Sequence, residues 1–110
     1  MEIAVKTRHI RISPRKLRLV VDLVRGELVG SAMNTLKFTT KRGAKIVYKT
    51  LMSAVANAGN KGTMDVENLY VKKVWVDEGS TMKRHMPRAQ GRATIIRKRM
   101  SHLNIVLDEK

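Results

Sequence analysis

The chain has 110 residues, a length that suits one domain and is too short for two domains with separate cores. Hydrophobic residues make up 43% of it, while 23 lysines and arginines against 9 aspartates and glutamates give a formal net charge of +14. A field of this strength favours a polyanionic partner, and the absence of cysteine excludes disulfides, thiolate chemistry and cysteine-based zinc sites. We therefore expect a single domain over residues 1–110.

The sequence shows neither an export signal nor a membrane-spanning segment. The first residues carry no charged lead followed by an apolar run, and nowhere do about 18 apolar residues occur together. We therefore expect a cytoplasmic protein with no membrane partner.

The chain opens on a predicted strand followed by a predicted helix. β-Branched residues stand among basic ones over residues 3–12, with Ile10 and Ile12 on one face. Ser13-Pro14 predicts a helix start, because serine can accept from an unpaired amide and proline suits the first helical position. Apolar residues recur at helical spacing toward Gly26, which can adopt the left-handed conformation that commonly ends a helix. Those apolar residues are Leu17, Val20, Val21 and Val24.

Two further helices are predicted before the chain turns to strands. Apolar residues from Val29 to Leu36 indicate a short helix that ends before Phe38. After Thr40 as a cap, one apolar stripe indicates a longer helix, which the glycines of residues 59–62 end. The stripe consists of Ala44, Val47, Leu51, Ala54, Val55 and Ala58.

From Leu69 the apolar period changes to two, which predicts a strand with Leu69, Val71 and Trp75 on one face. Trp75 is the only tryptophan, and on an alternating strand we expect it to pack in the core or at a sheet edge rather than to stack on a base. A second alternating stretch covers residues 93–107, so the two stretches should pair as a hairpin.

The part of this hairpin at about residues 78–99 has no acidic side chain after Glu78 to balance its cations. No aspartate or glutamate lies between Glu78 and Asp108, and core-forming residues are nearly absent from 78–99, apart from Ile95 and Ile96. We expect this part to project as a basic arm that its partner neutralises, reaching about 35 Å at ~3.3 Å per residue.

Several segments of the chain resemble the bacterial large-subunit ribosomal protein family numbered twenty-two, and together they span its length. In the body they are SPRKLRLV at 13–20, LVRG at 23–26, SAVANA at 53–58 and VDEG at 76–79. The strongest is MKRHMPRAQGRA at 82–93, which looks like that family's hairpin tip almost residue for residue.

The resemblance implies an α+β fold, with three helices packed on a small antiparallel sheet of about three strands and a long protruding β-hairpin. It implies a structural constituent of the large ribosomal subunit that supports assembly. The globular part would lie near the peptide exit, and the arm's tip would line the tunnel where macrolides and arrest peptides are sensed. Implied partners are large-subunit ribosomal RNA, neighbouring large-subunit ribosomal proteins and the nascent peptide. The tip residues are Met82, Lys83, Arg84, Pro87, Arg88, Ala89, Gln90 and Gly91.

Basic residues of the arm, the first strand and the first helix are the expected contacts to ribosomal RNA. A guanidinium group can chelate phosphate oxygens or stack on a base. Cations in the first turns of a helix also oppose its dipole, a conflict that an external anion would relieve. The predicted RNA-binding residues are Arg8, Arg11, Arg15, Lys16, Arg18, Lys83, Arg84, Arg88, Arg92, Arg97, Lys98 and Arg99. Four cations of the long helix fit phosphate contact and plain solvation about equally: Lys41, Arg42, Lys45 and Lys49.

The main alternative is an architectural DNA-binding protein with a basic β-ribbon arm, which would need an apolar wedge at the arm tip and a dimer interface. An enzyme is not expected, because His9, His85 and His102 are scattered among cations without metal-ligand spacing, and no phosphate-cradling glycine loop occurs. We therefore expect no catalytic residue, metal, cofactor or small-molecule substrate.

Overall fold

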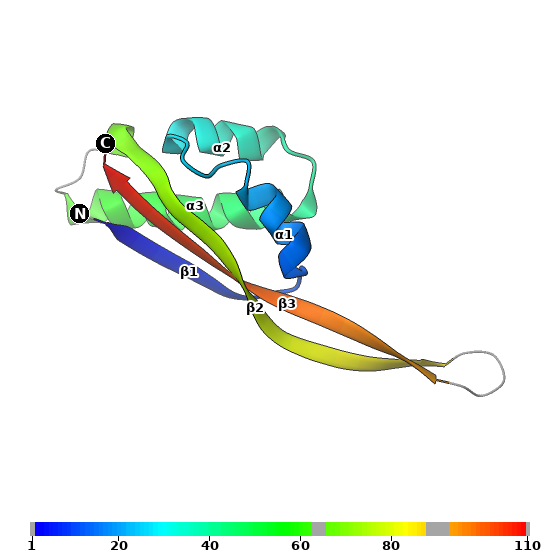
Figure 1. Ribbon diagram of the computed structural model, residues 1–110. Coiled ribbons are helices and arrows are strands. Elements are labelled where there is room, and N and C mark those ends of the chain that lie inside the picture. The colour runs from blue at the N-terminus through cyan, green and yellow to red at the C-terminus, as the bar shows by residue number, and fades with distance from the viewer. Residues whose placement is uncertain (1, 63–65, 88–92, 110) are drawn as a thin grey trace.

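The computed structural model describes residues 2–62, 66–87 and 93–109, with the backbone alone at residues 80, 82–87 and 93–98. Its elements are β1 (Ile3–Ile10), α1 (Pro14–Val21), α2 (Val29–Phe38), α3 (Arg42–Lys61), a 3-10 turn (Val66–Asn68), β2 (Leu69–Pro87) and β3 (Ala93–Glu109). The strands form one antiparallel sheet in the order β1-β3-β2, on which the three helices pack (Figure 1). The α+β fold expected from the resemblance is confirmed.

α1 packs its apolar side on the sheet, and Leu17, Val20 and Val21 are at most 1% exposed. The helix begins at Pro14 with Ser13 in the capping position, as predicted, but the side chain of Ser13 makes no capping hydrogen bond. The helix also ends at Val21, several residues before Gly26. Its end is early because the chain must leave the helix for Gly26, which has a left-handed φ of 79°, to pair with β2.

The apolar stripe of α3 lies against the sheet and the other helices as the sequence predicts. Val47, Leu51 and Ala54 are fully buried, and Gly62 ends the helix with a left-handed φ of 68°. The expected cap at Thr40 is wrong: Lys41 occupies the capping position, with no side-chain hydrogen bond.

α3 also passes very close to α1 at Gly43. A Cβ atom there would lie 3.1 Å from Cδ1 of Leu17 and 3.3 Å from Cγ2 of Val20. A Cβ atom here would force these side chains to shift by a few tenths of an ångström, so glycine suits the approach, which places the start of α3 beside α1.

β2 contains a bulge between Val71 and Lys73, which changes the face on which its later residues lie. Leu69, Val71, Val74 and Val76 are all buried, at 4% exposure or less. The expectation that Trp75 shares a face with Leu69 and Val71 is therefore wrong. Trp75 lies on the face turned away from the helices and is 41% exposed, so it is not a core residue.

The buried side chains of the described residues form one continuous core between the sheet and the helices. Ile3 and Ile10 of β1, Leu103 of β3 and Leu36 of α2 all belong to it. No helix in the described part of the chain is long and apolar enough to cross a membrane.

β2 and β3 continue past the helices as a two-stranded ribbon, which gives the molecule principal extents of 64 × 24 × 17 Å (Figure 1). Their pairing extends from Thr81 opposite Arg99 to Pro87 opposite Ala93. A second bulge of β2, between Glu78 and Thr81, marks the base of this arm. The predicted site residues Arg88, Ala89, Gln90, Gly91 and Arg92 lie outside the described residues.

Candidate nucleic-acid interface

The base of the arm is organised around Ser101 of β3. Ser101 is fully buried and stands opposite both Ile10 of β1 and Glu78 of β2. Its hydroxyl donates to the carbonyl of Ile12 at 2.5 Å, which fastens the connection between β1 and α1 to the same point. Two segments that are remote in sequence, residues 8–18 and 78–101, are thereby brought together.

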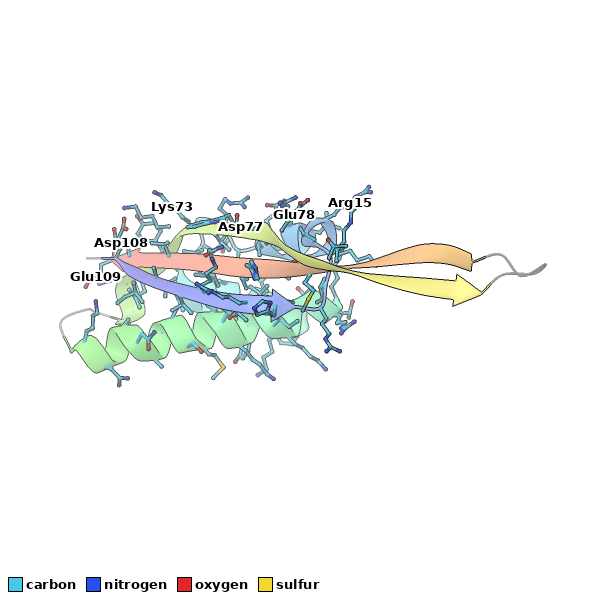
Figure 2. All side chains as sticks on the ribbon, turned by 90° about the horizontal axis from the view of Figure 1, so that it is seen from below. Arg15, Lys73, Asp77, Glu78, Asp108 and Glu109 are labelled. Carbon is cyan, nitrogen blue, oxygen red and sulfur yellow. The ribbon has the colours of Figure 1, made fainter. Side chains whose placement is uncertain are left out.

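Five predicted RNA-binding cations lie at this end of the globule, and we call them the neck cluster. They are Arg8, Arg11, Arg15, Lys16 and Arg18. All five are exposed, and Figure 2 shows Arg15 at the end from which the arm leaves. Apart from Arg18, none of them forms a hydrogen bond or an ion pair with any side chain that the structure describes. These cations are therefore free to meet an external anion.

Arg18 also has a structural partner, which the sequence did not predict. Its Nη2 donates to the carbonyl of Val76 at 2.9 Å, and Nη2 of Arg25 donates to the carbonyl of Val74 at 3.0 Å. β2 is an edge strand, so its outer carbonyls have no strand partner, and the two arginines satisfy them. Arg18 thus holds α1 to the strand that becomes the arm.

Backbone pairing covers the outer edge of β2 where the arginines do not reach. The N–H of Gly26 donates to the carbonyl of Val71, and the N–H of Val71 donates to the carbonyl of Glu27, both at 2.9 Å. This edge of the sheet is therefore closed along the globule, and the neck cluster keeps a defined position relative to the arm.

The N-terminal ends of α1 and α3 add to the positive field of the neck. Neither helix has an acidic residue in its first turn, and Lys41, Arg42 and Lys45 are exposed where α3 begins. Partial positive charge at helix N-termini favours anions. The sequence left these three cations open, because only the contact at Gly43 reveals that α3 begins beside α1.

Within the arm, the strand register brings one pair of cations opposite each other and places further cations on β3 beside it. Lys83 stands opposite Arg97, Met82 opposite Lys98, and Thr81 opposite exposed Arg99. Like charges at opposed positions destabilise a hairpin, and no acid occurs between Glu78 and Asp108 to compensate. A polyanion along the ribbon would relieve this repulsion, so the arm continues the basic surface of the neck.

Ion pairs occur at the other end of the sheet. Lys72 donates to Glu2 and, at 3.5 Å, to Asp108. The hydrogen bond from Lys72 lowers the pKa of Glu2, the same bond raises the pKa of Lys72, and the backbone N–H of Glu109 lowers the pKa of Asp108. Figure 2 shows Asp108 and Glu109 at the end of the sheet opposite the arm. Two other acidic residues, Asp77 and Glu78, lie near the base of the arm, where the cations of the neck cluster outnumber them (Figure 2).

Two of the histidines that look scattered in sequence meet in the fold. The bulge of β1 gives His9 a positive φ of 59°, and its backbone N–H donates to Nδ1 of His102 at 3.1 Å. The rings meet edge to face with centroids 5.2 Å apart. Among the described residues no group of three potential metal ligands exists, so we interpret this pair as a joint between β1 and β3.

Comparison with known proteins matches almost the whole chain. The family model described as "Ribosomal protein L22p/L17e" matches residues 5–108, which include the neck cluster and both strands of the arm.

Similar full-length proteins carry the name "Large ribosomal subunit protein uL22". The one from Syntrophotalea carbinolica is 54% identical over 110 residues and is covered completely, as is this chain. The one from Thermus thermophilus is also 54% identical over 110 residues, which are 100% of this chain and 97% of the relative. The one from a Thermoanaerobacter species is 56% identical over 110 residues, or 100% and 99% of the two chains.

Proposed function

Because the chain belongs to the ribosomal protein L22p/L17e family, we propose that its neck cluster and arm are the surfaces by which it holds large-subunit ribosomal RNA. The protein is a structural constituent of the large subunit of the cytoplasmic ribosome and is not an enzyme. Its partners are large-subunit ribosomal RNA and other ribosomal proteins.

The observation that supports this proposal is the convergence of unpaired cations at the base of the arm. The pairing of Ser101 with both β1 and β2 gathers residues 8–18 there, whereas the ion pairs of Lys72 lie at the far end. Phosphate contacts of this kind fix position and orientation on RNA. The neck cluster would anchor the globule, and the cations of residues 83–99 would let the ribbon pass between RNA segments.

We further propose that the tip of the arm lines the peptide exit tunnel and contacts the nascent peptide, in the region of macrolides and arrest peptides. The resemblance of residues 82–93 to the family's hairpin tip supports this. The elongated shape supports it as well, since a ribbon two strands wide can enter a passage that excludes the globule. The chain would act as one domain that supports subunit assembly. Family membership removes the basis for the competing DNA-binding function.

A sucrose gradient of a lysate washed in high salt tests the RNA-holding role with tagged protein. The wild-type protein should migrate with the large subunit. High salt removes proteins that are bound by charge alone, so a protein that stays with the subunit is an integral component of it. A variant with Arg8, Arg11, Arg15 and Lys16 changed to Gln should lag in entering the subunit. Wild-type protein at the top of the gradient, or with DNA, would contradict the proposal.

A photocrosslinking amino acid tests the tunnel role separately. Placed at Pro87, the last described residue of β2 before the tip, it should crosslink to nascent peptides on translating ribosomes. The matched control is Met52 of α3, which is 47% exposed on the globule and should not crosslink to them. Equal yields from the two positions would argue against a tip that lines the tunnel.

A further inference from the structure

The sheet face turned away from the helices is covered by no element of the described chain. Because Val74 and Val76 point into the core, Trp75 between them lies on this open face. The register aligns Trp75 with Asn104 of β3 and, beyond it, with Lys6 of β1. The adjacent row contains Lys73 opposite Val106. On the open face, Trp75 thus lies on the edge strand β2, with Lys73 two residues away on the same strand and Lys6 across the central strand.

Burial on this face indicates how the indole lies. Asn104 and Val106 are only 9% and 8% exposed, although the helices are on the other side of the sheet. Their neighbours on the open face must therefore lie over them, and Trp75 is the large side chain directly opposite Asn104. Trp75 itself stays 41% exposed. The indole is therefore partly covered by the sheet and partly open to a partner.

The charges around Trp75 favour an anionic partner over a protein. Lys6 and Lys73 are exposed, and neither forms an ion pair with a carboxylate in the described part of the chain. The neighbouring acids Glu2 and Asp108 form their ion pairs with Lys72 instead. The nearest acid on the strand, Asp77, accepts a hydrogen bond from Nδ2 of Asn104 at 3.1 Å. The core of a protein–protein interface is depleted in lysine, whereas base stacking beside phosphate-binding cations is typical of single-stranded RNA recognition.

We propose that Trp75, Lys6 and Lys73 form a binding site for an unpaired nucleotide of RNA. The base stacks on the exposed side of the indole, and the two ammonium groups contact the flanking phosphates. This site rests on the proposed RNA-holding function, and it adds a contact on the open face of the sheet beyond those of the neck cluster. It also assigns to Trp75 the stacking role that its sequence pattern disfavours.

The single tryptophan makes the site directly observable by fluorescence. Full-length protein is titrated with a single-stranded adenine oligonucleotide and, separately, with an RNA duplex of the same length, each carrying a fluorescent label for anisotropy. Both RNAs should bind through the neck cluster. Only the single strand should quench the emission of Trp75, since the bases of a duplex are already stacked on one another.

Variants give the second readout. Trp75→Ala should weaken single-strand binding about 5- to 150-fold, the range expected for loss of one base–aromatic stack, and leave duplex binding unchanged. Trp75→Phe should retain most of the affinity. The matched control is Phe38→Ala, because Phe38 is an aromatic residue 81% exposed on α2. Lys6→Gln and Lys73→Gln, which leave the core untouched, should weaken single-strand binding as well.

The outcomes separate this site from the proposed function. If both RNAs bind but the emission of Trp75 is unchanged and Trp75→Ala binds as the wild type does, the nucleotide site is refuted and the RNA-holding function stands. If neither RNA binds, the proposed function itself fails. Should Trp75→Ala not fold, quenching in the wild type and the two lysine variants decide the question.

Discussion

The salt dependence of RNA binding gives the sharpest test of the neck cluster. The change is a fourfold variant in which Arg8, Arg11, Arg15 and Lys16 become Gln. All four are exposed and bound to no described side chain, whereas Arg18 is left in place because it holds the carbonyl of Val76. Exposed substitutions of this kind shift the free energy of unfolding by no more than about 0.5 kcal/mol. The free variant should therefore keep its thermal transition.

The magnitude follows from the number of contacts removed. Each phosphate neutralised by a cation contributes about 0.7 to 0.9 to the slope of log affinity against log salt concentration. If each of the four residues meets one phosphate, the slope of the variant should be shallower by about 2.8 to 3.6. Between roughly 50 and 200 mM salt, the affinity ratio of wild type to variant should then shrink by about 50- to 150-fold.

Fluorescence anisotropy with a labelled transcript of large-subunit ribosomal RNA, repeated over a salt series, measures these slopes. The control changes Lys61, which is exposed at the C-terminal end of α3. This control should alter the slope by less than about one. A fourfold variant whose slope matches the wild type, or matches the control, would refute the assignment of the neck cluster to phosphate binding.

Three further predictions concern the frame that carries this surface. Gly79→Ala should destabilise the protein by about 1–3 kcal/mol, because its Cβ would lie 3.2 Å from the carbonyl carbon and oxygen of Met100; an unchanged thermal midpoint would contradict this. Gly43→Ala should destabilise the wild-type protein, because the new methyl group would press on Leu17. In the Leu17→Ala variant, where that space is free, the same change should stabilise the protein. If the two changes have additive effects on the free energy of unfolding in chemical denaturation, the close approach is contradicted. Lys72→Met should lower the thermal midpoint at neutral pH. Because Lys72 is the main cause of the lowered pKa of Glu2, the stability that this pair contributes is present above the ordinary pKa of 4.5 and is lost as the pH falls below it. The difference in thermal midpoint between variant and wild type should therefore close in acid, and a constant difference would contradict the ion pair.

Several features of the fold follow from local sequence patterns. The apolar stripe of α3 and the buried residues of α1 recur at helical spacing, and two stretches of period two become β2 and β3. The gap without acids between Glu78 and Asp108 indicates the arm. These predictions succeed because side-chain periodicity and charge distribution are properties of contiguous residues.

Other features required the tertiary contacts. The alternating pattern of β2 does not reveal the bulge between Val71 and Lys73. One extra residue in a strand moves every later side chain to the opposite face of the sheet, and Trp75 therefore lies on the open face. Lys41 and Arg42 joined the neck only because α3 begins beside α1. Ser13 and Thr40 were expected to cap α1 and α3, but neither helix has a side-chain capping hydrogen bond.

By itself, then, the sequence determined the helices, the two long strands, the basic arm and the family to which the chain belongs. The tertiary structure decided which cations stand together, that Arg18 closes the edge of β2, and that His9 meets His102. The physical reason is that periodicity is encoded within a few turns or strand residues. Register and adjacency depend instead on pairings such as that of Ser101 with both Ile10 and Glu78, whose partners are far apart along the chain.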